Sequence, residues 1–390
     1  MAMINYLYIS PEFPPNYMNF ITQLDKAAVN VWAIGESDFT VLPEHVRSCI
    51  KWYVKADLYD KNRIREITNY LLNDHVMPMT GKGFDVVESH NEHWLRLQAF
   101  INDAFKIQGI SSKNIDMIKK KSEMKKSFIS LGLDPAKGRL VVDLKDALKL
   151  ASELSYPVIL KPDEGVGATR LFKIENETQL KEAWSKINDD YIMEEFLNAD
   201  IVTYDGLLDW KGNIIFENSL VYECGVIENV QNGRDQFFYT TRTIPQALKK
   251  MGKDIVDLFG LKKQFFHFEF FKDGQDYRPI EINARPPGGQ IIDMMNYSID
   301  DDLYAAYAKM IAKQDNNISS NKKFFCAYIG RRDRDYAHSH HEIVSKYHNN
   351  LANHFTNPEL FWQAMGKYIY LMRAETEKTL YEIKEFILLS

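Results

Sequence analysis

The chain has 390 residues, of which 45% are hydrophobic and 13% aromatic, and its formal net charge is −6. This length and apolar content suit a globular protein of two or three domains and exclude a disordered chain. The net charge argues against a nucleic-acid-binding surface, and we interpret the run Lys119–Lys121 as a solvated helix start.

Three scattered cysteines, Cys49, Cys224 and Cys326, lack disulfide or metal-site spacing, which favours a reducing compartment. The sequence begins without a signal-peptide pattern, and no run approaches 18 apolar residues. We therefore expect a cytoplasmic protein that binds neither membrane nor nucleic acid.

In the first part of the chain, strand-like runs at 6–9, 29–34 and 85–88 alternate with helical patterns at 61–73 and 92–107. Such alternation predicts a doubly wound parallel-sheet domain over residues 1–110. The motif Gly81-Lys82-Gly83 precedes a strand-like run, so a dinucleotide site is not expected. Candidate substrate contacts follow the strand ends, where open sheets bind ligands: Ser10, Pro11, Glu12, Glu88, Ser89, His90 and Glu92.

The segment 156–174 has the pattern of a strand, a glycine-containing loop and a second strand. Gly165 and Gly167 would let backbone N–H groups approach a phosphate, and Lys161 would add a positive charge beside it. The loop is not a P-loop, because no Gly-Lys-Ser/Thr follows. A plain surface turn is the alternative.

The segment 264–289 predicts two strands that alternate apolar and polar residues. Phe266, Phe268 and Phe270 would occupy one face, with His267 and Glu269 on the other. The second strand alternates in the same way, and the pair Asp273-Gly274 supplies the turn. Its apolar positions are Ile280, Ile282 and Ala284, and its polar positions are Glu281, Asn283 and Arg285.

Folding about that turn would bring Glu269 and Glu281 together on one face, where two like charges repel. A cation between them would relieve this repulsion, and oxygen ligands with the Asn283 amide suit Mg²⁺. Arg285, on the same face, would hold a planar anion by a forked contact. The alternative is a half-buried hairpin whose polar face meets water.

Taken together and in this order, these segments resemble the ATP-grasp superfamily, of the carboxylate–amine ligase type. Lys121 opens an amphipathic helix that resembles the segment of the family's first nucleotide-contacting lysine. The run 191–197 is similar to the hinge strand whose backbone meets adenine. The resemblance implies a two-lobed ATP-grasp domain at 111–318, with a small lobe at about 111–190 and a large lobe at about 191–318.

The resemblance also implies ATP as the nucleotide and Mg²⁺, or Mn²⁺ in its place, as the metal. It makes Glu269, Glu281 and Asn283 metal ligands, and Arg285 and Lys161 catalytic residues. The implied nucleotide contacts are Lys121, Lys161, Gly165, Gly167, Ala168, Thr169, Glu194, Glu195, Phe196 and Leu197. This chain departs from the family at Ile201, where many members have a ribose-binding glutamate, although Asp200 is adjacent.

Residues 319–390 predict a C-terminal α+β segment, with strands at 324–329 and 367–373 and a helix at 377–388. The run His338-Ser339-His340-His341 lacks partners at zinc-site spacing, so we interpret it as a solvated loop. The cluster Arg331–Arg334 is also interpreted as a solvated loop, with an acidic substrate group as the alternative ligand.

The function that the resemblance implies is ATP-dependent activation of a carboxylate as an acyl phosphate, which an amine or another nucleophile then attacks. Such a reaction requires positioning and charge compensation instead of a protein nucleophile. The expected partners are small-molecule carboxylate and amine substrates, with homodimerisation as a further possibility. A kinase-like phosphotransferase and a nucleotide-binding protein without turnover are the alternatives.

Overall fold

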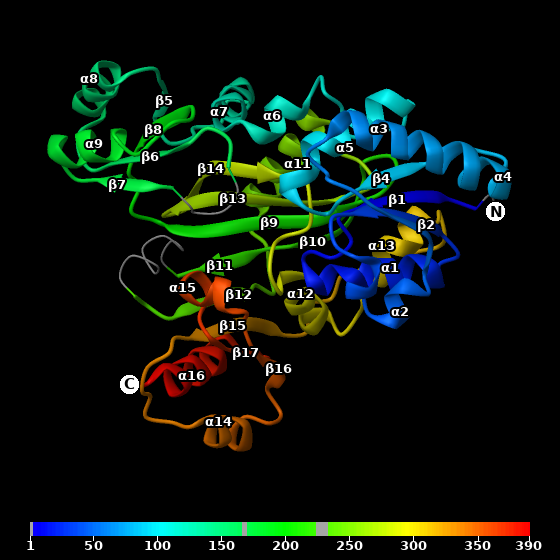
Figure 1. The fold of residues 1–390 in the computed structure, drawn as a ribbon. Coiled ribbons are helices and arrows are strands. Elements are labelled where there is room, and N and C mark those ends of the chain that lie inside the picture. Colours follow the sequence, from blue (N-terminus) through cyan, green and yellow to red (C-terminus); the bar gives the residue numbers. More distant parts are fainter. Residues whose placement is uncertain (1–2, 166–169, 224–232) are drawn as a thin grey trace.

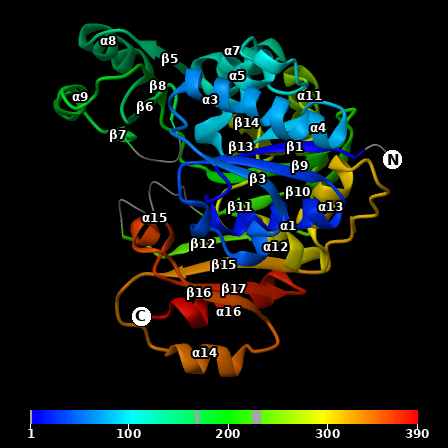
Figure 2. The same cartoon turned by 45° about the vertical axis from the view of Figure 1, so that its right-hand side comes forward.

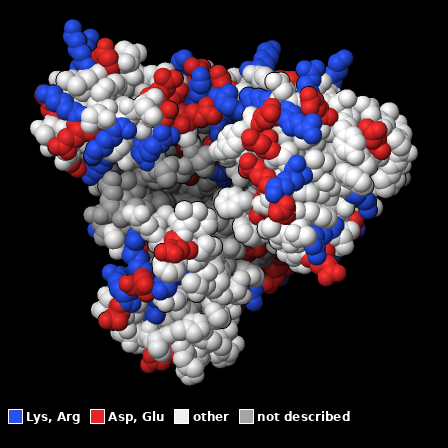
Figure 3. All heavy atoms as spheres, viewed as in Figure 1, with Lys and Arg blue, Asp and Glu red and all other residues white. Residues whose placement is uncertain are grey.

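The computed structural model describes residues 3–165, 170–223 and 233–390. Their strands form three sheets. The four-stranded sheet that contains β6 and the nine-stranded sheet that contains β13 lie on opposite sides of a central hollow (Figures 1 and 3). Among these residues, every helix is too short or too polar to cross a membrane.

The N-terminal domain is a parallel sheet in the order β3-β2-β1-β4. The predicted alternation of strands and helices is confirmed, but sequence reasoning missed β3, an edge strand whose mostly accessible side chains lack a buried run. The strands are β1 (Asn5–Ile9), β2 (Asn30–Gly35), β3 (Ile50–Lys55) and β4 (Val86–Glu88). The helices are α1 (Met18–Lys26), α2 (Glu44–Arg47), α3 (Lys61–Tyr70), α4 (Met77–Thr80) and α5 (Leu95–Phe105), and short helical turns are η1 (Pro15–Tyr17), η2 (Phe39–Val41), η3 (Leu71–Val76) and η4 (Glu92–Trp94).

Both faces of this sheet are buried, which explains the apolar character of its central strand. In β1, Leu7 and Ile9 pack with residues of α3 and α5, whereas Tyr6 and Tyr8 pack with Phe20 of α1 and with helices of the large lobe. The second contact joins the N-terminal domain to the rest of the protein through a shared hydrophobic core.

The small lobe is an antiparallel sheet in the order β5-β8-β6-β7, covered by helices (Figure 1). The predicted strand, loop and strand are confirmed as β6 and β7, in which Leu160 pairs with Phe172. Gly167, Ala168 and Thr169 lie outside the described residues. The elements are α6 (Ile115–Lys119), α7 (Lys121–Ser130), β5 (Gly138–Val141), α8 (Leu144–Leu154), β6 (Val158–Pro162), β7 (Phe172–Ile174), α9 (Glu177–Trp184) and β8 (Tyr191–Glu195).

The large lobe is built on an antiparallel sheet in the order β14-β13-β9-β11-β12-β15-β17-β16, with β10 paired to β9. The predicted C-terminal strands continue this sheet, because β15 pairs with β12 (Figure 2). The strands are β9 (Asp200–Leu208), β10 (Ile214–Asn218), β11 (Leu220–Tyr222), β12 (Gln236–Thr240), β13 (Phe265–Asp273), β14 (Asp276–Asn283), β15 (Phe325–Arg331), β16 (Leu351–Thr356) and β17 (Tyr368–Ala374). The helices are α11 (Gln246–Phe259), α12 (Ile291–Ile299), α13 (Leu303–Ile311), α14 (His340–Lys346), α15 (Trp362–Met365) and α16 (Glu377–Leu388), and the turn η5 spans Glu359–Phe361. The domain boundaries at 110 and 318 stay predictions.

The hairpin of β13 and β14 has the predicted apolar face. Phe266, Phe268 and Phe270 are fully buried in a core shared with α7 and α11. The turn lies one residue later than predicted, because Asp273 still pairs with Asp276 and leaves Gly274 and Gln275 as the loop. Gly274 has a φ of +61°, a conformation that glycine adopts without strain.

Candidate active site

Three adjacent strands of the large sheet place six polar side chains on one face. The register pairs Glu269 with Glu281 on one side and with Thr203 on the other. Two residues before Glu269 on β13, His267 is opposite Asn283 on one side and Asp205 on the other. Because alternate residues of a strand share a face, these six form a compact grid. We call them the polar grid: Thr203, Asp205, His267, Glu269, Glu281 and Asn283.

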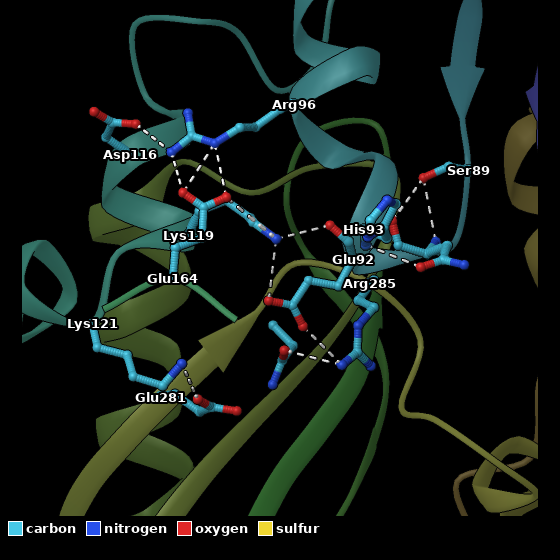
Figure 4. Close-up of polar contacts among 12 residues, drawn as sticks. Ser89, Glu92, His93, Arg96, Asp116, Lys119, Lys121, Glu164, Glu281 and Arg285 are labelled. Atoms are coloured by element: carbon cyan, nitrogen blue, oxygen red, sulfur yellow. Dashed lines mark hydrogen bonds and ion pairs between the residues drawn. The ribbon is translucent and has the colours of Figure 1, made fainter. Parts of the chain in front are cut away.

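The opposed carboxylates of the polar grid remain partly accessible to solvent. The side chains of Glu269 and Glu281 are 28% and 25% exposed. The Lys121 ammonium lies 3.3 Å from a Glu281 carboxylate oxygen (Figure 4). Burial would raise the pKa of Glu281, but Lys121 and Lys161 outweigh it and hold that pKa below its usual value. Glu281 is therefore ionised at neutral pH.

Glu269 is held from the side by a buried histidine. His267 Nε2 lies 3.2 Å from Glu269 Oε1, and His267 Nδ1 lies 2.5 Å from Asp205 Oδ1. Burial would lower the pKa of His267, but the two carboxylates raise it to about 9. The imidazole is then a cation that donates to both carboxylates.

A second charge cluster joins two strands and helix α7 of the small lobe. Glu194 of β8 contacts two ammonium groups, Lys161 at 2.6 Å and Lys125 at 2.8 Å. Burial would raise the pKa of Glu194, but the two lysines hold it below its usual value. The predicted nucleotide-binding lysine on β6 is therefore fixed by the side chain of a predicted hinge residue.

Arg285 follows β14 and has three acceptors within the protein. Its guanidinium donates to Pro286 O at 2.8 Å, Glu92 Oε2 at 3.0 Å and Asn283 Oδ1 at 3.1 Å. Burial would lower the pKa of Arg285, but Glu92 raises it above its usual value. The structure thus brings together Glu92 and Arg285, which the sequence suggested as separate candidates (Figure 4).

The predicted hinge residues lie where the small lobe joins the large sheet. Glu195 accepts a hydrogen bond from the Lys137 amide and pairs with Arg278 at 3.0 Å. Lys173 lies 4.0 Å from the centre of the Phe196 ring. Leu197 belongs to the connection to β9, and Gly165 follows the end of β6. Their roles in nucleotide binding stay predictions.

Several other candidates have structural partners. Glu12 Oε1 accepts the amides of Glu36 and Ser37, which ties together two loops. The guanidinium of Arg331 is buried and donates to Ile387 O at the end of α16, so the interpretation of Arg331 as part of a solvated loop is wrong. His340 Nδ1 lies 3.0 Å from the Tyr370 hydroxyl.

The interpretation of 119–121 as a solvated helix start is also wrong. Lys119 is only 4% exposed, because its ammonium points inward to Glu92 O at 3.0 Å. Burial lowers the pKa of Lys119, and Glu92 opposes that shift. A run of three lysines contains no periodic signal that tells which one is buried. Arg96, Lys125 and Asp205 were missed for a related reason: their partners are distant in sequence, so no local pattern marks them.

Within the described residues, no group of three or more His, Cys, Asp or Glu side chains is arranged as a metal site. The candidate metal ligands are two carboxylates and one amide, a set that differs from such clusters and suits a hard cation that keeps waters and bridges to phosphate.

A family model described as ATP-grasp domain matches residues 154–294. This range includes β6, the polar grid and Arg285. Over residues 154–294, the chain matches the ATP-grasp domain family. The predicted resemblance is therefore confirmed over the segment that carries the polar grid, Lys161, Glu194 and Arg285.

Curated proteins similar to this chain include carbamoyl phosphate synthase large chains. That of Campylobacter jejuni is 25% identical over 142 residues, 35% of this chain and 12% of that protein. That of Thermotoga neapolitana is 26% identical over 204 residues, 48% of this chain and 18% of that protein. This chain thus spans less than a fifth of the length of either relative.

Solved structures share the fold over almost the whole chain. An L-amino acid ligase from Bacillus licheniformis has a TM-score of 0.77, with 14% identity over 99% of this chain and 97% of that one. The N5-carboxyaminoimidazole synthetase of Staphylococcus aureus, complexed with ADP, has a TM-score of 0.70 at 14% identity over 99% and 98%. The biotin carboxylase domain of the Hydrogenobacter thermophilus 2-oxoglutarate carboxylase, in complex with MgADP and bicarbonate, has 0.65 at 14% over 96% and 87%. At these identities the likeness establishes the fold.

Proposed function

We propose that this protein is an ATP-dependent ligase that phosphorylates a carboxylate and joins the acyl phosphate to an amine. One observation carries the proposal: opposite charges of the two lobes meet where Lys121 lies 3.3 Å from Glu281. The large sheet contributes the opposed carboxylates Glu269 and Glu281, and the small lobe contributes the ammonium groups of Lys121 and Lys161. A triphosphate with a divalent cation matches both sets.

The charges of the cleft fit a magnesium nucleotide. Glu281 is ionised and a quarter exposed, and the side-chain oxygen of Asn283, which accepts from Arg285 at 3.1 Å, lies on the same face. We assign the metal to Glu269, Glu281 and Asn283. When bound there, Mg²⁺ or Mn²⁺ would neutralise phosphate oxygens and polarise the terminal phosphorus.

The remaining residues of the cleft would compensate charge in the reaction. Lys161 would exchange Glu194 for phosphate oxygens, and Lys121 would do the same with Glu281. Arg285, at the end of β14 beside the N-terminal domain, would contact the transferred phosphoryl group. This arrangement stabilises charge that spreads over phosphate oxygens in the transition state.

The N-terminal domain and the connection at Glu92 would form the acceptor side of the cleft. The structural likeness to an L-amino acid ligase supports amino acids or small metabolic acids as substrates. Likeness to an ADP complex and to a MgADP complex supports the nucleotide assignment.

The test is a screen of carboxylic acids with MgATP and hydroxylamine. An acyl phosphate reacts with hydroxylamine to give a hydroxamate, so the proposal predicts acid-dependent hydroxamate and ADP. With the matching amine in place of hydroxylamine, ADP release should continue and an amide should form.

A phosphotransferase would instead release ADP and a stable phosphorylated product without hydroxamate. A nucleotide-binding protein without turnover would bind ADP and release none. Either result across a panel of amino and small metabolic acids would contradict the ligase assignment.

A further inference from the structure

A network of alternating charges crosses the interface of the N-terminal domain, the small lobe and the large lobe (Figure 4). It begins at Asp116 of α6, which lies 2.8 Å from Arg96 of α5. Arg96 donates to both oxygens of Glu164, at 2.8 and 3.1 Å from Nε. Lys119 lies 3.8 Å from Glu164 and 3.5 Å from Glu92. The network ends at the ion pair of Glu92 and Arg285.

The inner end of this charge network is its most deeply buried part. The side chains of Lys119, Glu92 and Arg285 are 4%, 10% and 15% exposed, whereas Asp116 is 51% exposed. An ion pair away from solvent has few alternative partners, so its geometry is fixed more tightly than that of a surface pair.

Of the carboxylates in this charge network, only Glu92 contacts both inner cations, Lys119 and Arg285. One of its oxygens lies 3.0 Å from the Arg285 guanidinium and the other lies 3.5 Å from the Lys119 ammonium. Lys119 and Arg285 are both cations near the same carboxylate, so they repel each other, and the Arg285 charge contributes to lowering the pKa of Lys119. Without a negative charge at position 92, two buried cations would face each other.

Glu92 also comes from a different domain than the arginine it contacts. It lies in η4, directly after the acceptor side of the N-terminal sheet, whereas Arg285 follows a strand of the large sheet. The direction of the Arg285 guanidinium is therefore set partly by the N-terminal domain. Asn283 and Pro286, its other acceptors, are neighbours in the same segment and fix only its local conformation.

We propose that Glu92 is a positioning residue, which sets the orientation of the Arg285 guanidinium toward the transferred phosphoryl group and separates Arg285 from Lys119. This inference rests on the proposed function and adds a role for the N-terminal domain in the phosphoryl-transfer step. Glu92 acts through Arg285 and needs no contact with ATP.

The test compares Glu92→Gln with the natural chain by steady-state kinetics and by NMR. The glutamine keeps the shape of the side chain and one acceptor oxygen but removes the charge. We expect kcat to fall by about 100-fold, the scale of a misplaced catalytic group, with KM for ATP and ADP affinity unchanged. In an Arg285→Lys background the same substitution should change kcat far less, because the residue it positions is already altered.

The NMR measurement is independent of turnover. In protein with ¹⁵N-labelled arginine, the Nη signals of Arg285, assigned by their loss in Arg285→Lys, should be separate, because the ion pair slows rotation of the guanidinium. They should merge in Glu92→Gln. Glu66→Gln is the control, since Glu66 pairs with Arg63 on the surface of α3.

The possible outcomes separate the two proposals. A natural chain without ATP turnover would refute the ligase function, while the NMR signals would still test the contact. Unchanged kcat or unchanged Arg285 signals in Glu92→Gln would overturn the positioning role. If Glu92→Gln does not fold, Glu92→Asp, which keeps the charge but withdraws it from both cations, should lower kcat and merge the signals in the same way.

Discussion

Two buried polar regions of this protein handle charge in opposite ways. In the cleft, Glu194 and Glu281 are ionised because lysines surround them. At the interface of the N-terminal domain and α13, burial lowers the pKa of His90 to about 3 and raises that of Glu88 to about 7. The His90 imidazole stacks on Phe20 at 4.2 Å, and its Nε2 lies 3.1 Å from the Tyr6 hydroxyl, a partner without charge.

The difference shows which buried groups are suited to a charged ligand. A group that burial neutralises belongs to the packing of the core, and a ligand charge placed beside it would be poorly solvated. A buried group that stays charged needs a counter-charge, which a ligand of the same sign can replace. Glu281 and Glu194 are counter-charges of this kind for the lysines around them, and a triphosphate can compete with these carboxylates for the lysines.

The comparison is tested most strongly at Glu281. Glu281→Gln keeps the size of the side chain and removes the charge that faces Lys121. We expect ATP turnover to fall by about 10²–10³-fold, as when one electrostatic group is removed from a catalytic site. Acid-dependent ADP release is the measurement.

Glu217→Gln is the matched control for that variant. Glu217 lies on β10 of the same sheet, where it accepts a hydrogen bond from Tyr204 at 2.9 Å. Its activity should equal that of the natural chain. Normal turnover in Glu281→Gln would contradict the role of the cleft carboxylates.

The next largest effect is expected at Lys161. Replacing it with methionine keeps the apolar stem and removes the ammonium that Glu194 holds. A charge-assisted hydrogen bond contributes about 1.5–3 kcal/mol, so the Kd for ATP should rise by about 10- to 100-fold. Isothermal titration calorimetry measures it, with Lys250→Met on the surface of α11 as the control. Equal ATP affinity in the two variants would remove Lys161 from the nucleotide site.

The neutral region predicts a smaller effect, which appears in stability instead of activity. Between pH 3 and about 6.5 the unfolded chain protonates at position 90 and the native chain does not. The contribution of His90 to stability therefore rises with pH across this window, by at most about 1.4 kcal/mol per pH unit, and is constant above it. In His90→Gln the dependence should be weaker.

The midpoint of urea denaturation between pH 4.5 and 7 measures this effect. The natural chain and the surface control His45→Gln should lose more stability on acidification than His90→Gln does. The same slope in all three proteins would show that His90 is protonated in the native state.

The sequence predicts the strands and the faces of the site better than their charged partners. Alternation places Glu269 and Glu281 on one face, and the observed register confirms it. The helix at 377–388 was predicted with its observed bounds, since it has an amphipathic pattern and an N-cap residue.

The partners of Arg285 and Glu281 could not be predicted in this way. Glu92 and Arg285 are 193 residues apart, and their contact depends on how two domains pack. No local pattern reports such packing. The same holds for Asp205 and His267, which only the register of β9 and β13 brings together.

The central claim is that Glu269 and Glu281 hold a divalent metal together with a nucleotide. Electron paramagnetic resonance of Mn²⁺, titrated into the protein with ADP, tests it most directly. The account predicts that ADP promotes Mn²⁺ binding to the natural chain and that the Glu269→Gln/Glu281→Gln variant leaves Mn²⁺ free in solution. Equal Mn²⁺ binding by a correctly folded double variant would contradict it.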